Sequence, residues 1–295
     1  MSKTICIYHA NCFDGMAAAW VVSQAYPNAE FIPGQYGDKK LELSLEQDCY
    51  ENANINDHYV IVDFSLPRQL MELMASKAKN MIVLDHHKTS MANCEGLNFC
   101  KFDMNQSGAG LAWRHFFPDK SVPNLIKYVE DRDLWRFSLP YSKEINAYIQ
   151  SYPIKLEMYD YLATELDDTY GLESARNAGA AVERYKDTMV AAICKHARLK
   201  LIGNYFVPLV QSGILMSEVG HYMCQQEYEY IDHRDNTTYM NKPPFAASYF
   251  IRDDGYIVYS LRSIGDFDVS EVAKKFGGGG HRNAAGFQLK AEEAI

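Results

Sequence analysis

Three short hydrophobic segments in the first 90 residues are each followed by a loop and then by a helical pattern. The segments lie at 3–9, 58–64 and 80–84 and contain mainly Ile, Val, Tyr and Leu. Residues 16–24 have the composition of a packed helix, and Pro67 opens another helix with apolar residues at helical spacing. Nearly all-apolar strands that alternate with helices predict a parallel sheet covered on both faces, and hence an α/β fold.

The pattern changes twice further along the chain. Helices are expected at 108–117 and 122–130, and residues 155–198 are mainly helical in composition. From residue 199 the chain returns to strands, at 246–251 and 256–262, with helices near 217–227 and 269–276. We therefore predict a parallel-sheet N-terminal domain over 1–154, a helical connector over 155–198, and a smaller α/β domain over 199–295.

The composition restricts the cellular location and the binding partners that we expect for the protein. Hydrophobic residues make up 47% and charged residues 23% of the chain, which fits a globular protein. No apolar run reaches the ~18 residues of a membrane span, and the N-terminus lacks the apolar run of a signal peptide, so we expect a cytoplasmic protein that does not bind membranes. The seven cysteines form no C-x-x-C pair, which indicates neither a disulfide framework nor a zinc ribbon. A net charge of -9 argues against binding to long duplex nucleic acid.

Acidic residues and histidines follow the predicted strands. Asp14 lies in the loop after the first strand, Asp63 ends the second, and Asp85-His86-His87 ends the third. Ligands bind outside the carboxyl ends of the strands in such sheets, so these side chains should meet. Buried carboxylates repel one another unless a cation or a proton intervenes, and carboxylate with imidazole suits Mn²⁺ or Fe²⁺. The alternative for the tripeptide alone is an Asp85 that caps the next helix beside two incidental histidines.

Several converging carboxylates also suit a pair of metal ions. Two ions about 3.5 to 4 Å apart can clamp the attacking and leaving oxygens of a displacement at phosphorus, so phosphate ester hydrolysis is the natural chemistry. Asp131, beyond a predicted helix, is a candidate fourth carboxylate. Alternatively, the acidic run at 130–133 is a solvated charged turn.

Near the C-terminus, a glycine run is followed by side chains that donate hydrogen bonds. Glycine lets the backbone approach a ligand closely, and consecutive N–H groups can cradle an anion. The alternative is a flexible hairpin with a surface arginine. The candidate anion-binding residues here are Gly278, Gly279, Gly280, His281, Arg282 and Asn283.

Four further residues have simpler roles. Ser107 precedes a predicted helix and is expected to cap it. Trp20, Trp113 and Trp135 can stack on nucleobases, but core packing is the more common role of tryptophan.

These motifs together resemble the DHH phosphoesterase superfamily. The resemblance rests on the segment 9–15, on Val62-Asp63-Phe64-Ser65, on Asp85-His86-His87, and on the glycine-histidine signature at 277–286. It implies a catalytic metal-binding domain with a manganese centre at the N-terminus and a DHH-associated domain that binds substrate at the C-terminus. The metal ligands that it implies are His9, Asp14, Asp63, Asp85, His86 and Asp131.

The resemblance also implies roles at the reaction centre. His87 is expected near the scissile phosphate, as an acid or as an electrostatic stabiliser, and Asp85 joins it as a catalytic residue. Arg262 and Ser263 match a position that contacts substrate phosphate, where an arginine can bind in a bidentate manner.

One motif departs from the family pattern. The family's first motif commonly is H-x-D-x-D-G, whereas this chain has Asn11 and Cys12 where a further aspartate is expected. The first metal site is then weaker, differently ligated or vacant, and a thiolate ligand would favour zinc or iron. Alternatively, Cys12 only fills a turn.

The sequence thus favours a phosphodiesterase of the oligoribonuclease or exonuclease type. We expect it to hydrolyse short single-stranded oligonucleotides with metal-activated water and one or two Mn²⁺ ions, with Mg²⁺, Co²⁺ and Zn²⁺ as alternatives. A second interpretation is a phosphatase or phosphodiesterase of a small nucleotide, such as a bisphosphate or cyclic dinucleotide, or of polyphosphate. A third is an inactive nucleotide-binding sensor. A homodimer is one alternative for its oligomeric state.

Overall fold

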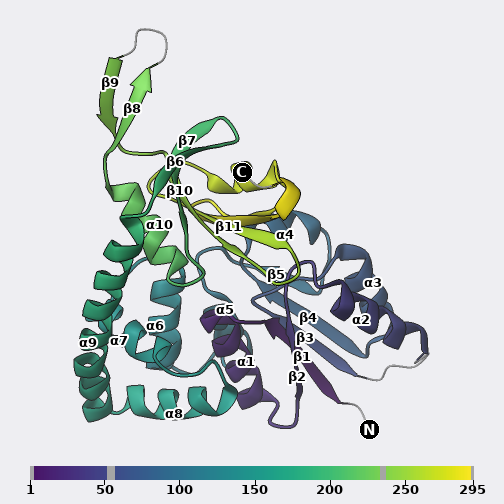
Figure 1. Cartoon of the computed structure of the whole chain (residues 1–295). Coiled ribbons are helices and arrows are strands. Elements are labelled where there is room, and N and C mark those ends of the chain that lie inside the picture. The colour runs from purple at the N-terminus through teal and green to yellow at the C-terminus, as the bar shows by residue number, and fades with distance from the viewer. Residues whose placement is uncertain (1–2, 52–56, 233–236, 294–295) are drawn as a thin grey trace. The chain divides into compact units, whose positions relative to one another are not determined.

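The computed structural model describes residues 3–51, 57–232 and 237–293, which form two compact units (Figure 1). The first unit is Met1–Glu183 and the second is Arg184–Ile295. The division falls inside the long helix α9 (Thr169–Cys194), within the segment 155–198 that was predicted to be a connector.

A five-stranded parallel sheet organises the first unit, as the strand pattern predicted. Its strand order is β2-β1-β3-β4-β5. The pattern did not predict β2, which contains Pro33; the strand is tolerated because it lies at the sheet edge, where a missing N–H breaks no central pairing. The strands are β1 (Thr4–His9), β2 (Glu30–Gly34), β3 (His58–Val62), β4 (Asn80–Asp85) and β5 (Cys100–Phe102).

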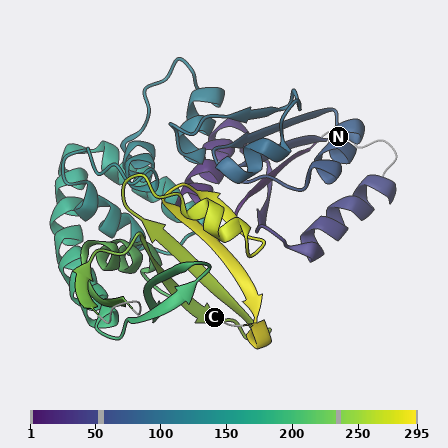
Figure 2. The ribbon, with the colours of Figure 1, turned by 90° about the horizontal axis from the view of Figure 1, so that it is seen from above.

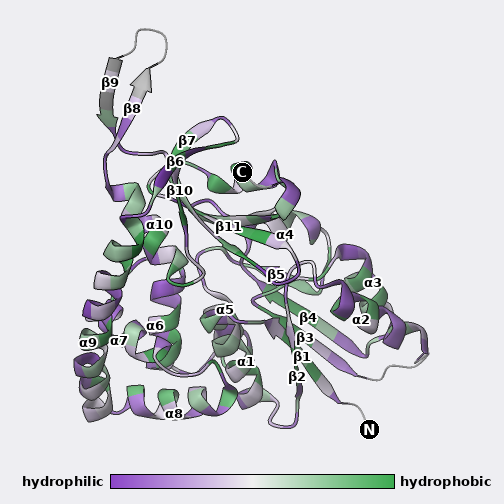
Figure 3. Ribbon diagram, viewed as in Figure 1, coloured by the Kyte–Doolittle hydropathy of each residue, from purple (hydrophilic) through white to green (hydrophobic). Residues whose placement is uncertain are grey.

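Helices cover both faces of this sheet, because the strands are apolar on both sides. In β3, Val60 and Val62 pack into one hydrophobic cluster, whereas Tyr59 and Ile61 pack into another. Figure 3 colours most of α2 hydrophilic, in keeping with a helix that rests on the surface. The helices are α1 (Phe13–Ala25), α2 (Lys39–Glu51), α3 (Arg68–Lys77), α4 (Lys88–Asn93), α5 (Gly108–Phe116), α6 (Asn124–Asp133), α7 (Ser142–Gln150) and α8 (Leu156–Asp167).

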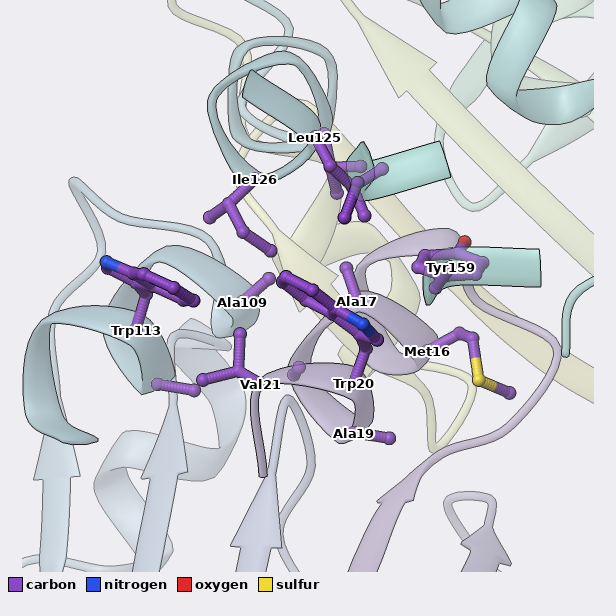
Figure 4. Packing of buried hydrophobic residues seen from close by; sticks show 14 of the residues in the cluster. Met16, Ala17, Ala19, Trp20, Val21, Ala109, Trp113, Leu125, Ile126 and Tyr159 are labelled. Carbon is purple, nitrogen blue, oxygen red and sulfur yellow. The ribbon is translucent and has the colours of Figure 1, made fainter. Parts of the chain in front are cut away.

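Two tryptophans lie in the larger cluster. Trp20 of α1 and Trp113 of α5 are 5% and 8% exposed, and their rings stack with centroids 6.0 Å apart (Figure 4). The indole N–H of Trp20 donates to Asp160 Oδ1 at 2.8 Å. The core role predicted for these two tryptophans is therefore confirmed, and neither ring presents a face for stacking on a base.

The second unit is built on a six-stranded mixed sheet of order β12-β13-β11-β10-β7-β6, with a separate hairpin β8-β9. Figure 2 shows the long strands of this sheet, green to yellow, running side by side. The predicted second α/β fold is thus confirmed. Its elements are β6 (Arg198–Ile202), β7 (Tyr205–Gln211), α10 (Met216–Gln225), β8 (Tyr228–Asp232), β9 (Thr237–Asn241), β10 (Phe245–Ile251), β11 (Tyr256–Ser263), α11 (Val269–Lys274), β12 (Gly279–His281), β13 (Ala284–Lys290) and the 3-10 turn η1 (Ala291–Glu293).

None of the helices in the described ranges combines the length and the apolar character that a bilayer crossing demands.

Candidate metal centre

The site lies at the carboxyl edge of the parallel sheet. β1 ends at His9, Asp63 directly follows β3, and β4 ends at Asp85. The Asp63 N–H still donates to Leu84 O at 2.9 Å, but its φ of 54° is left-handed and turns the chain out of the sheet. Aspartate is one of the few residues that adopt this conformation at low cost, so the strand can end on a carboxylate here.

Asp63 accepts hydrogen bonds from two histidines. His9 Nδ1 lies 3.3 Å from its Oδ2, and His86 Nε2 lies 3.0 Å from its Oδ1. Its carboxylate is only 1% exposed. Burial favours the neutral acid, but the hydrogen bonds from His86 and His9 outweigh burial and hold the pKa of Asp63 well below its usual range. Asp63 is therefore a buried anion.

The imidazole of His86 lies among three carboxylates. Its Nε2 is 3.0 Å from Asp63 Oδ1, 3.6 Å from Asp133 Oδ2 and 3.8 Å from Asp14 Oδ2. Burial alone would lower its pKa, but the carboxylates raise it to about 10. In the absence of a metal ion, a protonated His86 thus supplies the positive charge that this cluster requires.

Asp14 is fixed by the N-terminus of another helix. It lies in the first turn of α1, and its two carboxylate oxygens accept from the N–H groups of Gly108 at 2.6 Å and Ala109 at 3.1 Å, where α5 begins. Ser107 caps α5 through Gly110 N at 3.1 Å, which confirms its predicted role. A side chain at Gly108 would place its Cβ 2.4 Å from Asp63 Cβ, so only glycine allows this approach.

The pKa of Asp14 shows that the cluster is short of positive charge. Burial, then the charges of Asp63 and Asp133, raise its pKa well above the usual value. Burial likewise raises the pKa of Asp133, and burial with the neighbouring carboxylates raises that of the Cys12 thiol. Groups that retain protons because they are buried among other carboxylates would release them to a divalent ion.

Asp85 holds His87 in one orientation. Its Oδ1 lies 2.7 Å from His87 Nδ1, and because an ionised carboxylate only accepts, that nitrogen carries the proton. Its Oδ2 accepts from Ser65 Oγ at 2.5 Å and from the Tyr36 hydroxyl at 3.5 Å. Burial opposes ionisation, but the hydrogen bond and charge of His87 and the bond from Ser65 lower the pKa of Asp85.

Asp133, rather than Asp131, reaches the cluster. The sequence analysis ended the helix at residue 130, whereas α6 continues to Asp133 and so changes the direction of both side chains. Asp131 accepts from Ser138 N, Ser138 Oγ and Leu139 N at 2.9, 2.7 and 3.2 Å and fixes the following turn. The structure thus brings Asp133, and not the predicted Asp131, to the other acidic and histidine side chains.

The donor groups fit a divalent metal centre in the first unit. Three sets have ligand atoms within 4.8 Å of one another, and Asp63 belongs to two of them. Asp133 Oδ2 is buried and makes no hydrogen bond within the described residues. A shared carboxylate and a carboxylate oxygen without a hydrogen bond are features of a cation cluster. The sets are His9, Cys12 and Asp63; Asp63, Asp85 and His87; and Asp14, His86 and Asp133.

Tyr36 was not predicted as part of the site. It follows the unpredicted strand β2, and its hydroxyl reaches Ser90 Oγ at 3.1 Å as well as Asp85. Its ring contacts His9, His87 and Phe64 at centroid distances of 5.6, 5.6 and 4.9 Å. The only signal in the sequence was an aromatic residue within the turn-forming run at 33–37.

In the second unit, the polar candidates bind their own backbone and neighbours. Arg262 donates to Ser260 Oγ, Leu261 O and Ser217 Oγ. Ser263 Oγ donates to Phe267 O, and Asn283 donates to Ser263 Oγ. Arg282 donates to Asp266.

The glycine run packs against β13. A Cβ at Gly278 would lie 2.1 Å from Gly286 O, and Gly280 has a φ of 139°. Gly279, Gly280 and His281 form β12 and pair with β13. Close packing explains why glycine occupies 278 and 280, and the anion-cradle role of the run stays a prediction.

The fold and the site define an α/β protein with acidic and histidine clusters that are able to hold metal ions. Residues 235–295 match the DHHA1 domain family. A solved DHH domain, from a member of the s1p family of ribosomal proteins, is 13% identical and has a TM-score of 0.51, covering 98% of this chain and 82% of that one. The DHHA1 match over 235–295 and this shared fold agree with the resemblance to the DHH superfamily that the sequence motifs carry.

Two more proteins are similar. The uncharacterized protein R106 of Acanthamoeba polyphaga mimivirus is 26% identical over 301 residues, covering 96% of this chain; the chain spans 66% of that relative's length. RecJ of Thermus thermophilus, solved in complex with Mn²⁺, is 11% identical with a TM-score of 0.46, covering 99% of this chain and 50% of that one.

Proposed function

We propose that the protein is a metal-dependent phosphoesterase. One observation supports this most directly: the carboxylates of Asp14, Asp63 and Asp133, of which the first two are almost fully buried, surround the imidazole of His86 at the carboxyl edge of the sheet. A fold pays a large electrostatic cost for such a cluster unless cations occupy it. Asp14, Asp63, Asp85, Asp133, His86 and His9 would hold the ions.

Divalent ions at this edge would polarise a phosphoryl oxygen and make water a stronger nucleophile at neutral pH. The chain's own residues orient the reacting groups. α5 directs its first N–H groups at Asp14, and Ser65 and Tyr36 restrain Asp85. This prior order lowers the cost of arranging charges during the reaction.

His87 is the proposed proton donor. Asp85 fixes its Nδ1 proton, so Nε2 is the nitrogen that exchanges a proton with substrate. Burial would lower the pKa of His87, but the hydrogen bond and charge of Asp85 raise it, which favours the protonated ring. At Nε2 this proton can neutralise a leaving alkoxide or stabilise charge on the phosphate.

The proposed substrates are short single-stranded oligonucleotides. A net charge of -9 is unfavourable for long polyanions but is compatible with a few phosphates held near bound cations. In the second unit, Arg262, Ser263, Gly278, Gly279, Gly280, His281, Arg282 and Asn283 are the proposed contacts to the terminal nucleotide or phosphate.

A substrate panel tests this proposal. Purified protein is incubated with RNA and DNA of two to five nucleotides, cyclic dinucleotides, nucleotide bisphosphates and polyphosphate, each with Mn²⁺, Mg²⁺, Co²⁺ or Zn²⁺. We expect mononucleotides from the oligomers. Turnover of only the small nucleotides would assign the alternative substrate class, and tight ligand binding without turnover or bound metal would favour a sensor.

Two variants test whether the proposed metal centre is responsible for turnover. Asp63→Asn removes a shared anion with little change in volume, and we expect ~10³-fold slower turnover. Asp119→Asn alters an exposed aspartate of the same unit and should match the unmodified protein. Comparable activity in the two variants would remove this cluster from the mechanism.

A further inference from the structure

We propose that Cys12, together with His9 and Asp63, forms a thiolate-containing metal position that selects Zn²⁺ or Fe²⁺ over Mn²⁺ and Mg²⁺. The inference rests on the proposed function only for the presence of a metal centre at this edge of the sheet. It goes further by assigning the centre two chemically different positions.

The geometry of the first turn brings the sulfur to the site. Asn11 has a left-handed φ of 54°, and Cys12 precedes α1 in an extended conformation. The Cys12 side chain does not cap the helix, although it occupies the capping position. Its Sγ lies instead within 4.8 Å of ligand atoms of His9 and Asp63. The location of Cys12 is thus explained by its two neighbours rather than by the helix.

The donor set decides the kind of ion. One imidazole nitrogen, one thiolate sulfur and one carboxylate oxygen suit a borderline ion such as Zn²⁺ or Fe²⁺, whereas Mg²⁺ and Mn²⁺ prefer oxygen ligands. The set of Asp14, His86 and Asp133 contains no sulfur. Asp63 links the two positions, because it contacts both His9 and His86. We infer a centre with a softer position at Cys12 and a harder position at Asp14.

The other cysteines have ordinary packing roles. Cys6, Cys49, Cys94 and Cys224 are buried in hydrophobic clusters, and half-buried Cys100 packs against the cluster that contains Cys94. Half-buried Cys194 lies 3.7 Å from Val219 O. Within the described part of the chain, Cys12 is the cysteine that belongs to a set of potential metal ligands.

Cobalt spectroscopy tests the assignment without any substrate. Metal-free protein is titrated with Co²⁺, because a thiolate ligand produces an intense sulfur-to-cobalt charge-transfer band in the near ultraviolet. We expect this band in the unmodified protein, its loss in Cys12→Ser, and its retention in Cys194→Ser, the matched half-buried control. Added Zn²⁺ should abolish the band at equimolar concentration, whereas Mn²⁺ should leave it unchanged.

Two results would overturn the assignment: a band that persists in Cys12→Ser, or Co²⁺ binding by the unmodified protein without a band. If Cys12→Ser does not fold, the unmodified protein provides the answer through peptide-level mass spectrometry of iodoacetamide labelling. Zn²⁺ should protect Cys12 at least tenfold more than Mn²⁺ does, and equal labelling with both ions rejects the proposal.

A carboxylate at the same position provides the converse test. Cys12→Asp exchanges sulfur for oxygen, so Mn²⁺ affinity measured by electron paramagnetic resonance should rise about tenfold relative to Cys12→Ser, while Zn²⁺ affinity falls relative to the unmodified protein. An unchanged preference between Mn²⁺ and Zn²⁺ would contradict the assignment. A failure of this assignment can be told apart from a failure of the proposed function, because the cobalt band does not require turnover. Turnover without a band would reject only the metal position at Cys12.

Discussion

The carboxyl edge of the first sheet and the glycine-rich segment of the second unit were both predicted as functional, yet they differ in how their polar groups are satisfied. At the sheet edge, Asp14, Asp63 and Asp133 are close to one another, and His86 alone lies among all three. In the glycine-rich segment, Arg282 and Asn283 already have neutral or acidic partners in the segment 263–266 at the end of β11.

The difference separates two kinds of evidence. Surplus negative charge in a buried cluster demands a partner that the chain does not supply, and so indicates a ligand by itself. Satisfied donors around close-packed glycines are compatible with a purely structural segment. The proposed substrate role of the second unit therefore rests on the resemblance to the family, whereas the proposed metal centre rests on this molecule's own electrostatics.

Among the variants that separate the two regions, the largest effect is expected from exchanging Asp133, with Asp131 as its matched control. Asp133→Asn removes a charge from the cluster and should slow turnover at least ~10²-fold while weakening metal binding. Asp131→Asn places an amide donor against either Ser138 N or Leu139 N, so it should lower the free energy of unfolding by about 1 to 3 kcal/mol. Calorimetry with bound-metal analysis distinguishes the two. Loss of metal in Asp131→Asn alone would show that Asp131, and not Asp133, holds the metal.

Asp131 and Asp133 also show which part of the site cannot be predicted from the sequence. The strand ends at His9, Asp63 and Asp85 were predictable because apolar strands and polar ends are visible as a one-dimensional pattern. Asp133 was missed because the end of α6 decides which carboxylate faces the sheet, and helix ends depend on packing and on the turn after them. Tyr36 was missed because it follows an edge strand whose proline made the segment look unlike a strand.

Two adjacent glycines test the structural role of the second region. Gly278→Ala would drive a Cβ to 2.1 Å from Gly286 O, and we expect it to cost about 3 kcal/mol of stability. Gly277 has a φ of 77° and open space around its Cα, so Gly277→Ala should cost only about 1 kcal/mol. Denaturant unfolding measures both. Equal stability losses, or a specific loss of phosphate-ligand binding in a stable Gly278→Ala protein, would favour the anion cradle instead.

Ser65 tests how far the charged edge depends on its supporting hydrogen bonds. Ser65→Ala removes the 2.5 Å bond to Asp85 Oδ2 in a site where Asp85 is fully buried. We expect kcat to fall roughly tenfold with little change in KM, because the orientation of His87 loosens while substrate contacts remain. Ser76→Ala, on the exposed end of α3, is the control. A change in KM alone would place Ser65 at the substrate rather than behind Asp85.

Substitutions of Tyr36 should give the smallest effect, and two variants separate the contribution of its hydroxyl from that of its ring. The hydroxyl is 3.5 Å from Asp85 Oδ2, which is a weak bond beside the one from Ser65, so Tyr36→Phe should reduce kcat only about two- to threefold. The ring contacts His9 and His87 edge to face, and Tyr36→Leu should therefore cost a further several-fold. The double variant Ser65→Ala, Tyr36→Phe sharpens the test. Asp85 Oδ2 then loses both hydroxyl donors in a buried site, so the loss in kcat should exceed the product of the single losses, whereas simple multiplication would show that the two hydroxyls act independently.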